Sequence, residues 1–372
     1  MKPLFTTWTL KFMIILLIMV STYQIFISVQ VWVNVQTKVM FSRIYDEETV
    51  RALACTLNAR KLNEKFTFNE LSGYYSLMEL VEPSSVENDS IYMFETSGNI
   101  IIGSREACAM ESASHHHPDK HLYYFMTSYY VQISNILVTL LRNPKIHIVH
   151  LEYYRYFRNT PLENWFRTGK WRESHWRSSH VSDALRYVTL WRHGGLYLDT
   201  DVIVLKPTEN LTNFVGRESN KWLAAGILKF SQGHTFIQDC IQEFLGDFRG
   251  DVWGYQGPEL ITRVLDRQCN VSCHGCGRMD VMGVIDKETT CAGVTVYPTS
   301  YFYSIHWSNW SDLFTSDKVL SEKTLKKLEN SYLLHSWGMW SRNVKIFSAS
   351  SQPYAVLARE HCPKIIRHID KP

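Results

Sequence analysis

Residues 182–205 read SDALRYVTLWRHGGLYLDTDVIVL, and the rest of the chain can be interpreted around this stretch. Its first half predicts a helix over 182–193, with Ser182 as the N-terminal cap and Gly194-Gly195 as the end. Its second half, residues 196–205, is apolar on both sides of two carboxylates, which is typical of a strand buried in a sheet. The stretch therefore predicts a helix, a tight turn and a buried strand in succession.

Asp199 and Asp201 are the two carboxylates of this expected strand. The side-chain period of two in an extended strand would place both on one face. Like charges held together in apolar surroundings need a cation, a proton or a nearby base, and a divalent metal on hard oxygen ligands is the simplest solution. Asp183 and Arg186 lie three residues apart, on one face of the preceding helix. Their presence strengthens the metal interpretation.

The segments before this stretch alternate strand, helix, strand, helix, strand: 91–94, 105–114, 122–125, 131–142 and 146–149. A further helix is expected from Thr160, with Thr160 as its cap and Pro161 in its first turn. After the stretch, a strand over 222–230 and helices over 235–248 and 259–265 are expected. The alternation indicates a parallel sheet covered by helices, and the short connections favour one doubly wound α/β domain.

The N-terminal part contains an uncharged, largely apolar run over residues 12–33. As a helix rising ~1.5 Å per residue, it is long enough to cross a bilayer. We expect an uncleaved transmembrane anchor behind a cytoplasmic tail over 1–11; a cleaved signal peptide is the alternative. The chain would continue as a stem over 34–85 and a lumenal body over 86–372, because Pro and Ser cluster at 83–85.

The composition describes a folded body rather than a disordered one. Of the 372 residues, 45% are hydrophobic and 13% aromatic. The formal net charge of +3 is small for this length, and no block of basic residues is interleaved with aromatics. We therefore expect no nucleic-acid partner.

All eight cysteines and four glycosylation sequons follow the apolar run, which favours an oxidising lumen for the body. The cysteines are 55, 108, 240, 269, 273, 276, 291 and 362, and the sequons begin at Asn88, Asn210, Asn270 and Asn309. A zinc site formed by Cys269, Cys273, Cys276 and Cys291 with His274 is a weaker alternative to disulfides, because the spacing of these residues is imperfect. The run of histidines at 115–117 is interpreted as a solvated helix end or loop.

A different enzyme class also uses closely spaced aspartates. In haloacid-dehalogenase phosphatases the first aspartate of such a motif is a nucleophile, and residues 198–202 fit that pattern superficially. Those motifs follow the first strand of their domain and need a lysine and an acidic pair downstream. Here three strands are expected first, and no such acidic pair is evident, so the metal interpretation is favoured.

Residues 182–186 and 194–201 resemble the core of the α1,4-glycosyltransferases related to lactosylceramide 4-alpha-galactosyltransferase. The resemblance extends over about residues 91–363 and includes 95–97, 160–162, 211–213, 256–258, 291–294 and 335–337. It implies a GT-A (Rossmann-like) nucleotide-sugar-binding fold and a Golgi type II membrane enzyme. It also implies a nucleotide-sugar donor, Mn²⁺ and retention of the anomeric configuration.

The resemblance implies roles for five residues of the candidate site. Asp201 would contact the metal directly, and Asp199 would serve the metal shell and the ribose side. Asp183 and Arg186 would lie on the donor sugar, the first accepting from hydroxyls and the second donating to hydroxyl or phosphate oxygens. His335 would complete the metal site, since neutral imidazole is an acceptable ligand for Mn²⁺.

Gln256 is expected near the reaction centre or the acceptor; its alternative is a loop amide that holds the turn before Pro258. Two departures from the family pattern affect the choice of sugar: Gly338 stands where Asn is expected, and residues 224–227 read Ala-Ala-Gly-Ile instead of Leu-Asn-Gly-Ala. One or two aromatics among Tyr301, Phe302, Tyr303, Trp307 and Trp310 are expected to stack on acceptor sugars.

These features together predict an enzyme that moves galactose or N-acetylgalactosamine from a UDP-sugar to a glycolipid acceptor such as lactosylceramide. Its partners would be the UDP-sugar, the glycolipid, the membrane through residues 12–33, and other copies or other Golgi transferases in an oligomer. The alternative is a catalytically inactive, Golgi-anchored sugar-binding or partner protein on the same fold. The intact Asp183, Arg186, Asp199 and Asp201 argue against that alternative.

Overall fold

The structure is a computed structural model that describes residues 67–69, 74–76, 86–271 and 287–369. The tail and anchor expected over residues 1–33, and most of the expected stem, lie outside these ranges and stay predictions. Within the described part of the chain, none of the helices combines the length and the apolar character needed to cross a membrane.

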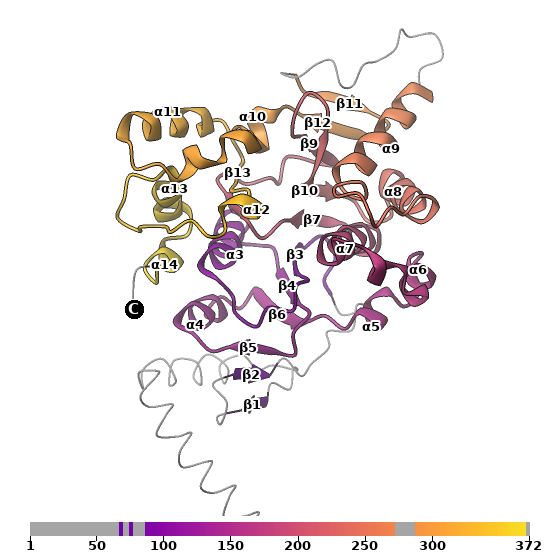
Figure 1. Cartoon of the computed structure of the whole chain (residues 1–372), viewed down its shortest axis with the longest axis horizontal. Helices are drawn as coiled ribbons and strands as arrows, with labels where there is room; N and C mark the ends of the chain where they lie inside the picture. Colours follow the sequence, from indigo (N-terminus) through magenta and orange to yellow (C-terminus); the bar gives the residue numbers. More distant parts are fainter. Residues whose placement is uncertain (1–66, 70–73, 77–85, 272–286, 370–372) are drawn as a thin grey trace, which may run out of the picture.

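A mixed sheet of eight strands forms the centre of the molecule (Figure 1). Its order is β11 (Thr289–Cys291), β12 (Val294–Tyr297), β9 (Phe214–Arg217), β10 (Leu223–Phe230), β7 (Gly195–Leu198), β3 (Ile91–Glu95), β4 (Leu122–Met126) and β6 (Ile146–His150). The last four strands of this order are parallel, whereas β10 is antiparallel to both of its neighbours. The predicted α/β class with a parallel sheet is confirmed for this half.

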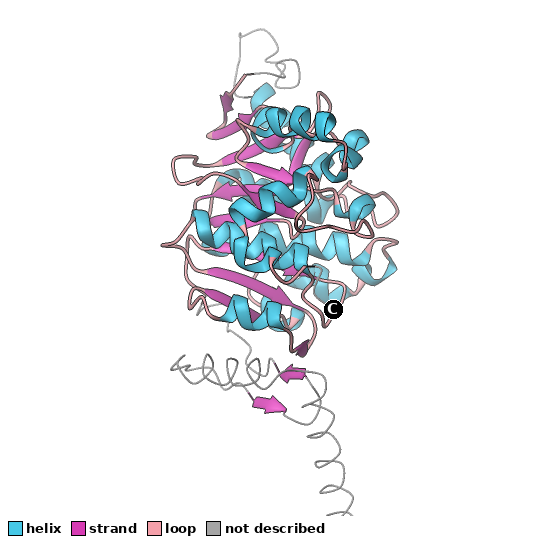
Figure 2. Ribbon diagram, turned by 90° about the vertical axis from the view of Figure 1, so that its left-hand side faces the viewer, coloured by secondary structure: helices cyan, strands magenta, loops and turns pink. Residues whose placement is uncertain are grey.

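Helices cover both faces of the sheet (Figures 1 and 2). One face carries α3 (Ser104–His116), α4 (Asn135–Leu141), α13 (Pro353–His361) and α14 (Pro363–Ile366). The other carries α5 (Tyr153–Phe157), α6 (Glu163–Thr168), α7 (Arg177–His193), α8 (Thr235–Gly246) and α9 (Pro258–Val271). The remaining elements are η2 (Lys170–Glu173), α10 (Thr299–Phe302), η3 (Trp307–Phe314), α11 (Lys318–Leu328), α12 (Gly338–Ser341) and a small sheet of β1 (Thr67–Asn69), β2 (Tyr74–Ser76) and β5 (Tyr130–Gln132).

Strand alternation explains why the sheet has a core on each face. In β3, Ile91 and Met93 join the core under α3, whereas Tyr92 and Phe94 join the core under α7. This is the period of two expected of a strand buried on both sides. Near-continuous apolar strands are therefore expected; β3 and β4 have them, whereas β6 includes His147 and His150.

Three of the predicted helices start at the wrong residue, and the helix expected over 259–265 continues to Val271. Residues 131–142 divide into the end of β5 and α4, and Ser134 caps α4 by accepting from the Leu137 amide. The helix expected from Thr160 begins at Glu163, as α6. The helix expected from Ser182 begins at Arg177, because α7 extends five residues further toward the N-terminus. Local cap signals were misleading where tertiary packing continues or delays a helix.

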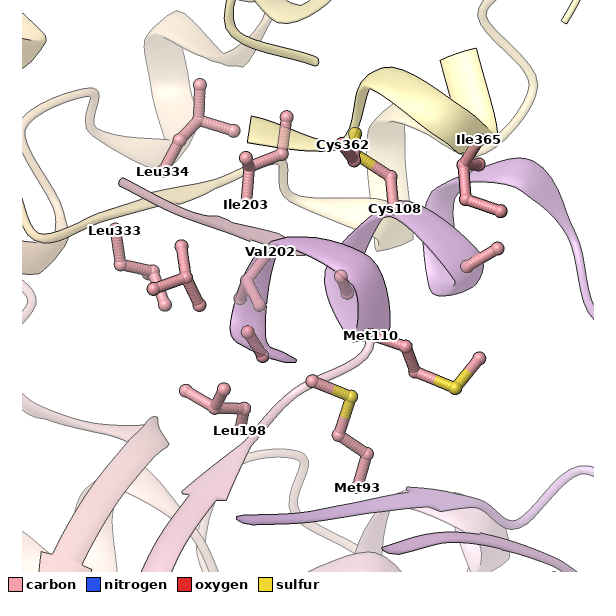
Figure 3. Close-up of a cluster of buried hydrophobic side chains, with 14 of the residues drawn as sticks. Met93, Cys108, Met110, Leu198, Val202, Ile203, Leu333, Leu334, Cys362 and Ile365 are labelled. Atoms are coloured by element: carbon pink, nitrogen blue, oxygen red, sulfur yellow. A yellow bond between two sulfur atoms is a disulfide. The ribbon is translucent and has the colours of Figure 1, made fainter. Parts of the chain in front are cut away.

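The predicted strand over residues 196–205 is in fact two strands. β7 ends at Leu198, the chain turns at residues 199–201, and β8 (Val202–Val204) pairs with β13 (Leu333–His335) in a separate two-stranded sheet. Figure 3 shows Val202 and Ile203 of β8 packed with Leu333 and Leu334 of β13. The two aspartates thus lie on a turn, and the expectation that strand periodicity aligns them is wrong.

Two disulfides are present among the described cysteines. Cys108 of α3 is bonded to Cys362 between α13 and α14 (Figure 3), and Cys269 of α9 to Cys291 of β11. The fifth described cysteine, Cys240, is buried and free. The pairing of Cys269 with Cys291 supports the disulfide interpretation over the zinc alternative, while residues 273–276 lie outside the described ranges.

Candidate active site

The pairing of β8 with β13 explains why His335 lies beside the two aspartates. His335 is opposite Val202 in this ladder. The Ser336 amide and hydroxyl both donate to the carbonyl oxygen of Asp201, each at 2.8 Å. On the other side, the Asp199 amide donates to the Gly226 carbonyl of β10 at 2.8 Å. Backbone bonds from two different sheets therefore hold the turn at residues 199–201.

Asp199, Asp201 and His335 form the group of described residues that could hold a metal ion. One ligand atom from each lies within 4.8 Å of the other two. His335 Nε2 is 3.4 Å from Asp201 Oδ1 and 3.9 Å from Asp199 Oδ2. Two carboxylates and one imidazole suit Mn²⁺ and related divalent ions. The residues present therefore fit the predicted metal.

Arg186 of α7 lies between two carboxylates of the site. Its Nη2 is 3.2 Å from Asp183 Oδ1, and its Nη1 is 3.6 Å from Asp199 Oδ1. Nη1 also donates to the carbonyl oxygen of Ala225 at 2.6 Å, and the guanidinium stacks 4.5 Å from the Tyr197 ring centroid. Arg186 and Asp183 are each only 6% exposed, so this ion pair is held in a fixed geometry. Arg186 therefore links Asp183 to Asp199; we call Asp183 and Arg186 the α7 pair.

The charges of the site shift one another's pKa. Burial raises the pKa of Asp183 to about 6; Arg186 opposes this shift and Asp199 adds to it. Burial acts to raise the pKa of Asp199 as well, but Arg186 and His335 outweigh it and the pKa is lowered. Burial would lower the pKa of His335, yet the charges of Asp201 and Asp199 raise it. Arg186 and His335 thus favour the charged form of Asp199, whereas burial works against the charged form of Asp183.

Gly226 and Gly338 leave room for the carboxylates of Asp199 and Asp201. A Cβ on Gly226 would lie 2.7 Å from Asp199 Oδ2, and one on Gly338 would lie 3.1 Å from Asp201 Oδ2. The Gly338 amide donates to that same Asp201 oxygen at 2.6 Å. The departure at Gly338 therefore places a backbone amide, with no side chain in the way, against the carboxylate of Asp201.

Gln256 makes no hydrogen bond or ion pair with the other five predicted site residues among the contacts of the described chain. Its side chain is fully buried; Nε2 donates to the Asp247 carbonyl at 2.8 Å, and Oε1 has no hydrogen-bond partner among the described residues. Its carbonyl oxygen accepts from the Tyr187 hydroxyl at 2.9 Å. The next residue, Gly257, lies against Asp183, since a Cβ there would be 2.8 Å from Oδ1. Gln256 therefore neighbours the α7 pair, and its catalytic role stays a prediction.

Two residues at the site were missed by the sequence reasoning. Tyr303, considered only for acceptor stacking, is 4% exposed, and its ring lies 5.4 Å from that of His335. Its hydroxyl has no partner among the described residues and would lie 2.9 Å from a Cβ on Gly226. Glu218 follows β9 and is half-buried; burial raises its pKa, and the charge of His335 counteracts this. Neither Tyr303 nor Glu218 belongs to a recognisable sequence motif, so their position beside the site can be seen only in the folded chain.

The aromatics predicted to contact the acceptor divide into buried and exposed residues. Phe302 and Tyr303 belong to the core, and Tyr301 and Trp310 pack against it. Trp307 is 44% exposed.

Two of the histidines at 115–117 take part in hydrogen bonds with other protein side chains. His116 is hydrogen-bonded to His361 at 3.0 Å, and His117 is hydrogen-bonded to Thr208 at 3.0 Å.

Comparisons with known proteins agree with this geometry. A family model described as "Alpha 1,4-glycosyltransferase conserved region" matches residues 229–369, and one described as "Glycosyltransferase sugar-binding region containing DXD motif" matches residues 103–222. Lactosylceramide 4-alpha-galactosyltransferase of Mus musculus is 31% identical over 294 residues, 78% of each chain. The chain belongs to the α1,4-glycosyltransferase family. This α1,4-glycosyltransferase is accordingly a hexosyltransferase, and the phosphatase interpretation is not supported.

Other relatives of this glycosyltransferase are named for different sugars. The Homo sapiens lactosylceramide 4-alpha-galactosyltransferase is 30% identical over 279 residues, 74% of this chain and 75% of the relative. The Homo sapiens alpha-1,4-N-acetylglucosaminyltransferase is 28% identical over 295 residues, 76% of this chain and 81% of the relative. A crystal structure of the galactosyltransferase LgtC is 13% identical and covers 76% of this chain and 97% of its own, with a TM-score of 0.35, too low to support the assignment.

Proposed function

We propose that the protein is a metal-dependent, retaining α1,4-glycosyltransferase. It transfers galactose or N-acetylgalactosamine from a UDP-sugar to a glycolipid such as lactosylceramide. The names of the relatives support this proposal, and the difference between their sugars makes the donor the first thing to test. A Golgi type II topology, with residues 12–33 as anchor and a GT-A fold in the lumen, completes the proposal.

The convergence of Asp199, Asp201 and His335 carries the proposal. Their ligand atoms lie within 4.8 Å of one another although His335 is more than 130 residues away in sequence. A divalent ion there would act as a Lewis acid on the diphosphate of the donor. Mn²⁺ matches the mixed oxygen and nitrogen donors.

The α7 pair supplies the donor contacts in this proposal. Asp183 is held through Oδ1 by Arg186, and as a carboxylate it can still accept from a sugar hydroxyl. Arg186 places one positive charge beside both Asp183 and Asp199, which favours the ionised form of each carboxylate near the negative donor. The pair therefore positions the donor sugar on the side of the bond opposite the diphosphate.

Retention is explained by a front-face displacement. The bond between the sugar C1 and the diphosphate oxygen breaks, and the acceptor oxygen bonds to C1 on the same face. The released diphosphate oxygen takes the proton of the acceptor hydroxyl. Gln256, an amide bonded to Asp247, would support the sugar rather than attack it.

The substitution Asp201→Asn tests the proposal, with the full chain in detergent micelles. UDP release is measured with and without Mn²⁺ and lactosylceramide, using UDP-galactose, UDP-N-acetylgalactosamine and UDP-N-acetylglucosamine. We expect a loss of roughly 100-fold or more in the variant with an unchanged melting temperature. The exposed Asp251, paired with Arg249, provides a matched control as Asp251→Asn.

An active Asp201→Asn variant that needs no metal would overturn the metal-dependent mechanism. A wild-type protein that binds UDP with Mn²⁺ but turns over none of the three donors would instead support the inactive sugar-binding alternative.

A further inference from the structure

Two tryptophans form an exposed surface beside the metal-binding residues. Trp307 of η3 is 44% exposed and Trp340 of α12 is 40% exposed. Their ring centroids are 5.5 Å apart with an interplanar angle of 22°. We call this pair the tryptophan platform. The two rings partly cover each other, and the exposed remainder of both indoles is apolar surface that would gain free energy from burial.

The platform is connected to the metal-binding residues through α12. The Gly338 amide that opens α12 donates to Asp201 Oδ2 at 2.6 Å, and the Trp340 amide donates to the Trp337 carbonyl at 2.9 Å. The ring of Trp337 lies 4.4 Å from that of His335 and 6.2 Å from that of Trp340. A continuous row of aromatic rings therefore runs from the metal-binding histidine to the platform.

Trp337 fixes this row in place. Its side chain is 7% exposed, and its Nε1 donates to the carbonyl oxygen of Ile305 at 2.9 Å. Ile305 lies two residues before Trp307, the second member of the platform. Trp337 adopts φ 56°, in the left-handed region that non-glycine residues rarely occupy. A strained residue of this kind persists where its surroundings hold it. Trp337 thus connects the platform to the residues beside Asp201 through buried contacts, as a subsite needs if it is to position a reacting group.

The chemistry of the platform suits a sugar ring better than an acyl chain. The C–H face of a pyranose packs flat on an indole, and its hydroxyls remain free to bond at the ring edge. The exposed part of the two indoles, close to the residues of the candidate site, offers such an aromatic surface. An acyl chain would instead be expected to need a groove of aliphatic side chains.

We propose that the tryptophan platform binds the acceptor, stacking a galactoside of the acceptor glycan on Trp340 and Trp307. This inference rests on the proposed function, because it assigns the acceptor side of the same site. It sharpens the expectation that one or two aromatics contact the acceptor by naming Trp307 and adding Trp340.

The test compares a soluble and a lipid-linked acceptor. Trp340→Ala and Trp307→Ala are assayed with methyl β-lactoside in solution and with lactosylceramide in phosphatidylcholine vesicles. We expect the acceptor KM to rise roughly tenfold for both acceptors, the size of a stacking contact, while the donor KM is unchanged. Trp340→Phe should recover part of the loss. Phe347→Ala is the matched control, because Phe347 is 47% exposed and its ring contacts Lys345.

Direct binding separates this proposal from the proposed function. Saturation-transfer NMR measures methyl β-lactoside binding in the presence of UDP and Mn²⁺, without turnover. Binding that is absent in the wild type, or unchanged in Trp340→Ala, would overturn the platform. A KM that rises only for vesicles would overturn it too and would indicate a lipid contact. Lactoside binding without transfer of any donor sugar would count against the proposed function and leave the platform standing.

Discussion

Gly226 shows how closely the site depends on a residue that carries no chemistry itself. Asp199 was expected from its motif, and so were Asp183 and Arg186 on the preceding helix. The need for glycine opposite Asp199 depends on β10 lying beside β7, a pairing between segments that are distant in the sequence. Sequence motifs therefore identify candidate ligands, but not the residues that leave space for them.

We expect Gly226→Ala to inactivate the enzyme while leaving it folded. The new methyl group would lie 2.7 Å from Asp199 Oδ2 and 2.9 Å from the Tyr303 hydroxyl, so the carboxylate must move. A displacement of about 1 Å can lower kcat roughly 100-fold, and overpacking costs about 1–3 kcal/mol of stability. Donor turnover and urea unfolding measure the two effects.

Gly246→Ala provides the control for this change. Gly246 ends α8, and a Cβ there would meet no atom within 4 Å. Its turnover should match the wild type. Equal turnover of Gly226→Ala and the wild type would mean that Asp199 can move without cost, and that its observed position is not needed for catalysis.

At the scale of elements, the break between β7 and β8 is the largest difference from expectation. The polar residues 199–201 interrupt the apolar run between Leu198 and Val202, but no Gly or Pro there marks the end of a strand. The division is imposed by β13, which pairs with β8 from residues 333–335 and brings His335 with it. The two aspartates do lie close together, but for another reason than the expected one, because they converge on a turn rather than along a strand.

The C-terminal helices are tied to α3 by the Cys108–Cys362 disulfide, which spans 254 residues of sequence. Cross-linking distant residues restricts the unfolded chain most, so replacing both cysteines by serine should lower the free energy of unfolding by about 2–5 kcal/mol. The same replacement at Cys269 and Cys291, which are 22 residues apart, should cost less. Urea unfolding of both double variants measures the order, and a larger loss at the second pair would contradict it.

At the scale of the whole molecule, buried histidines make stability depend on pH. Burial lowers the pKa of several described histidines: His116, His117, His150, His180, His193, His234 and His361. A lowered pKa means that the unfolded chain binds the proton before the folded one does. Each such histidine therefore favours folding above its unfolded pKa, and this contribution is lost as pH falls toward its folded pKa.

His193 at the end of α7 gives the clearest test. It is 4% exposed, its Nδ1 lies 3.2 Å from Asn88 Oδ1, and its Nε2 is buried without a partner among the described residues. Because Asn88 Oδ1 can only accept, Nδ1 carries the proton, and a second proton on Nε2 would be buried and unsatisfied. Burial, reinforced by Arg192, accordingly lowers the pKa of His193 from 6.5 to about 4.

We expect His193→Asn to reduce the acid sensitivity of the protein. Between pH 7.5 and pH 5 the wild type should lose about 2 kcal/mol of unfolding free energy through this residue, because the unfolded histidine is protonated at pH 5 and the folded one is not. The asparagine variant lacks this loss but keeps a donor for Asn88, so its urea midpoints at the two pH values should lie closer together. Parallel losses in both proteins would show that His193 takes up its proton equally in the folded and unfolded states.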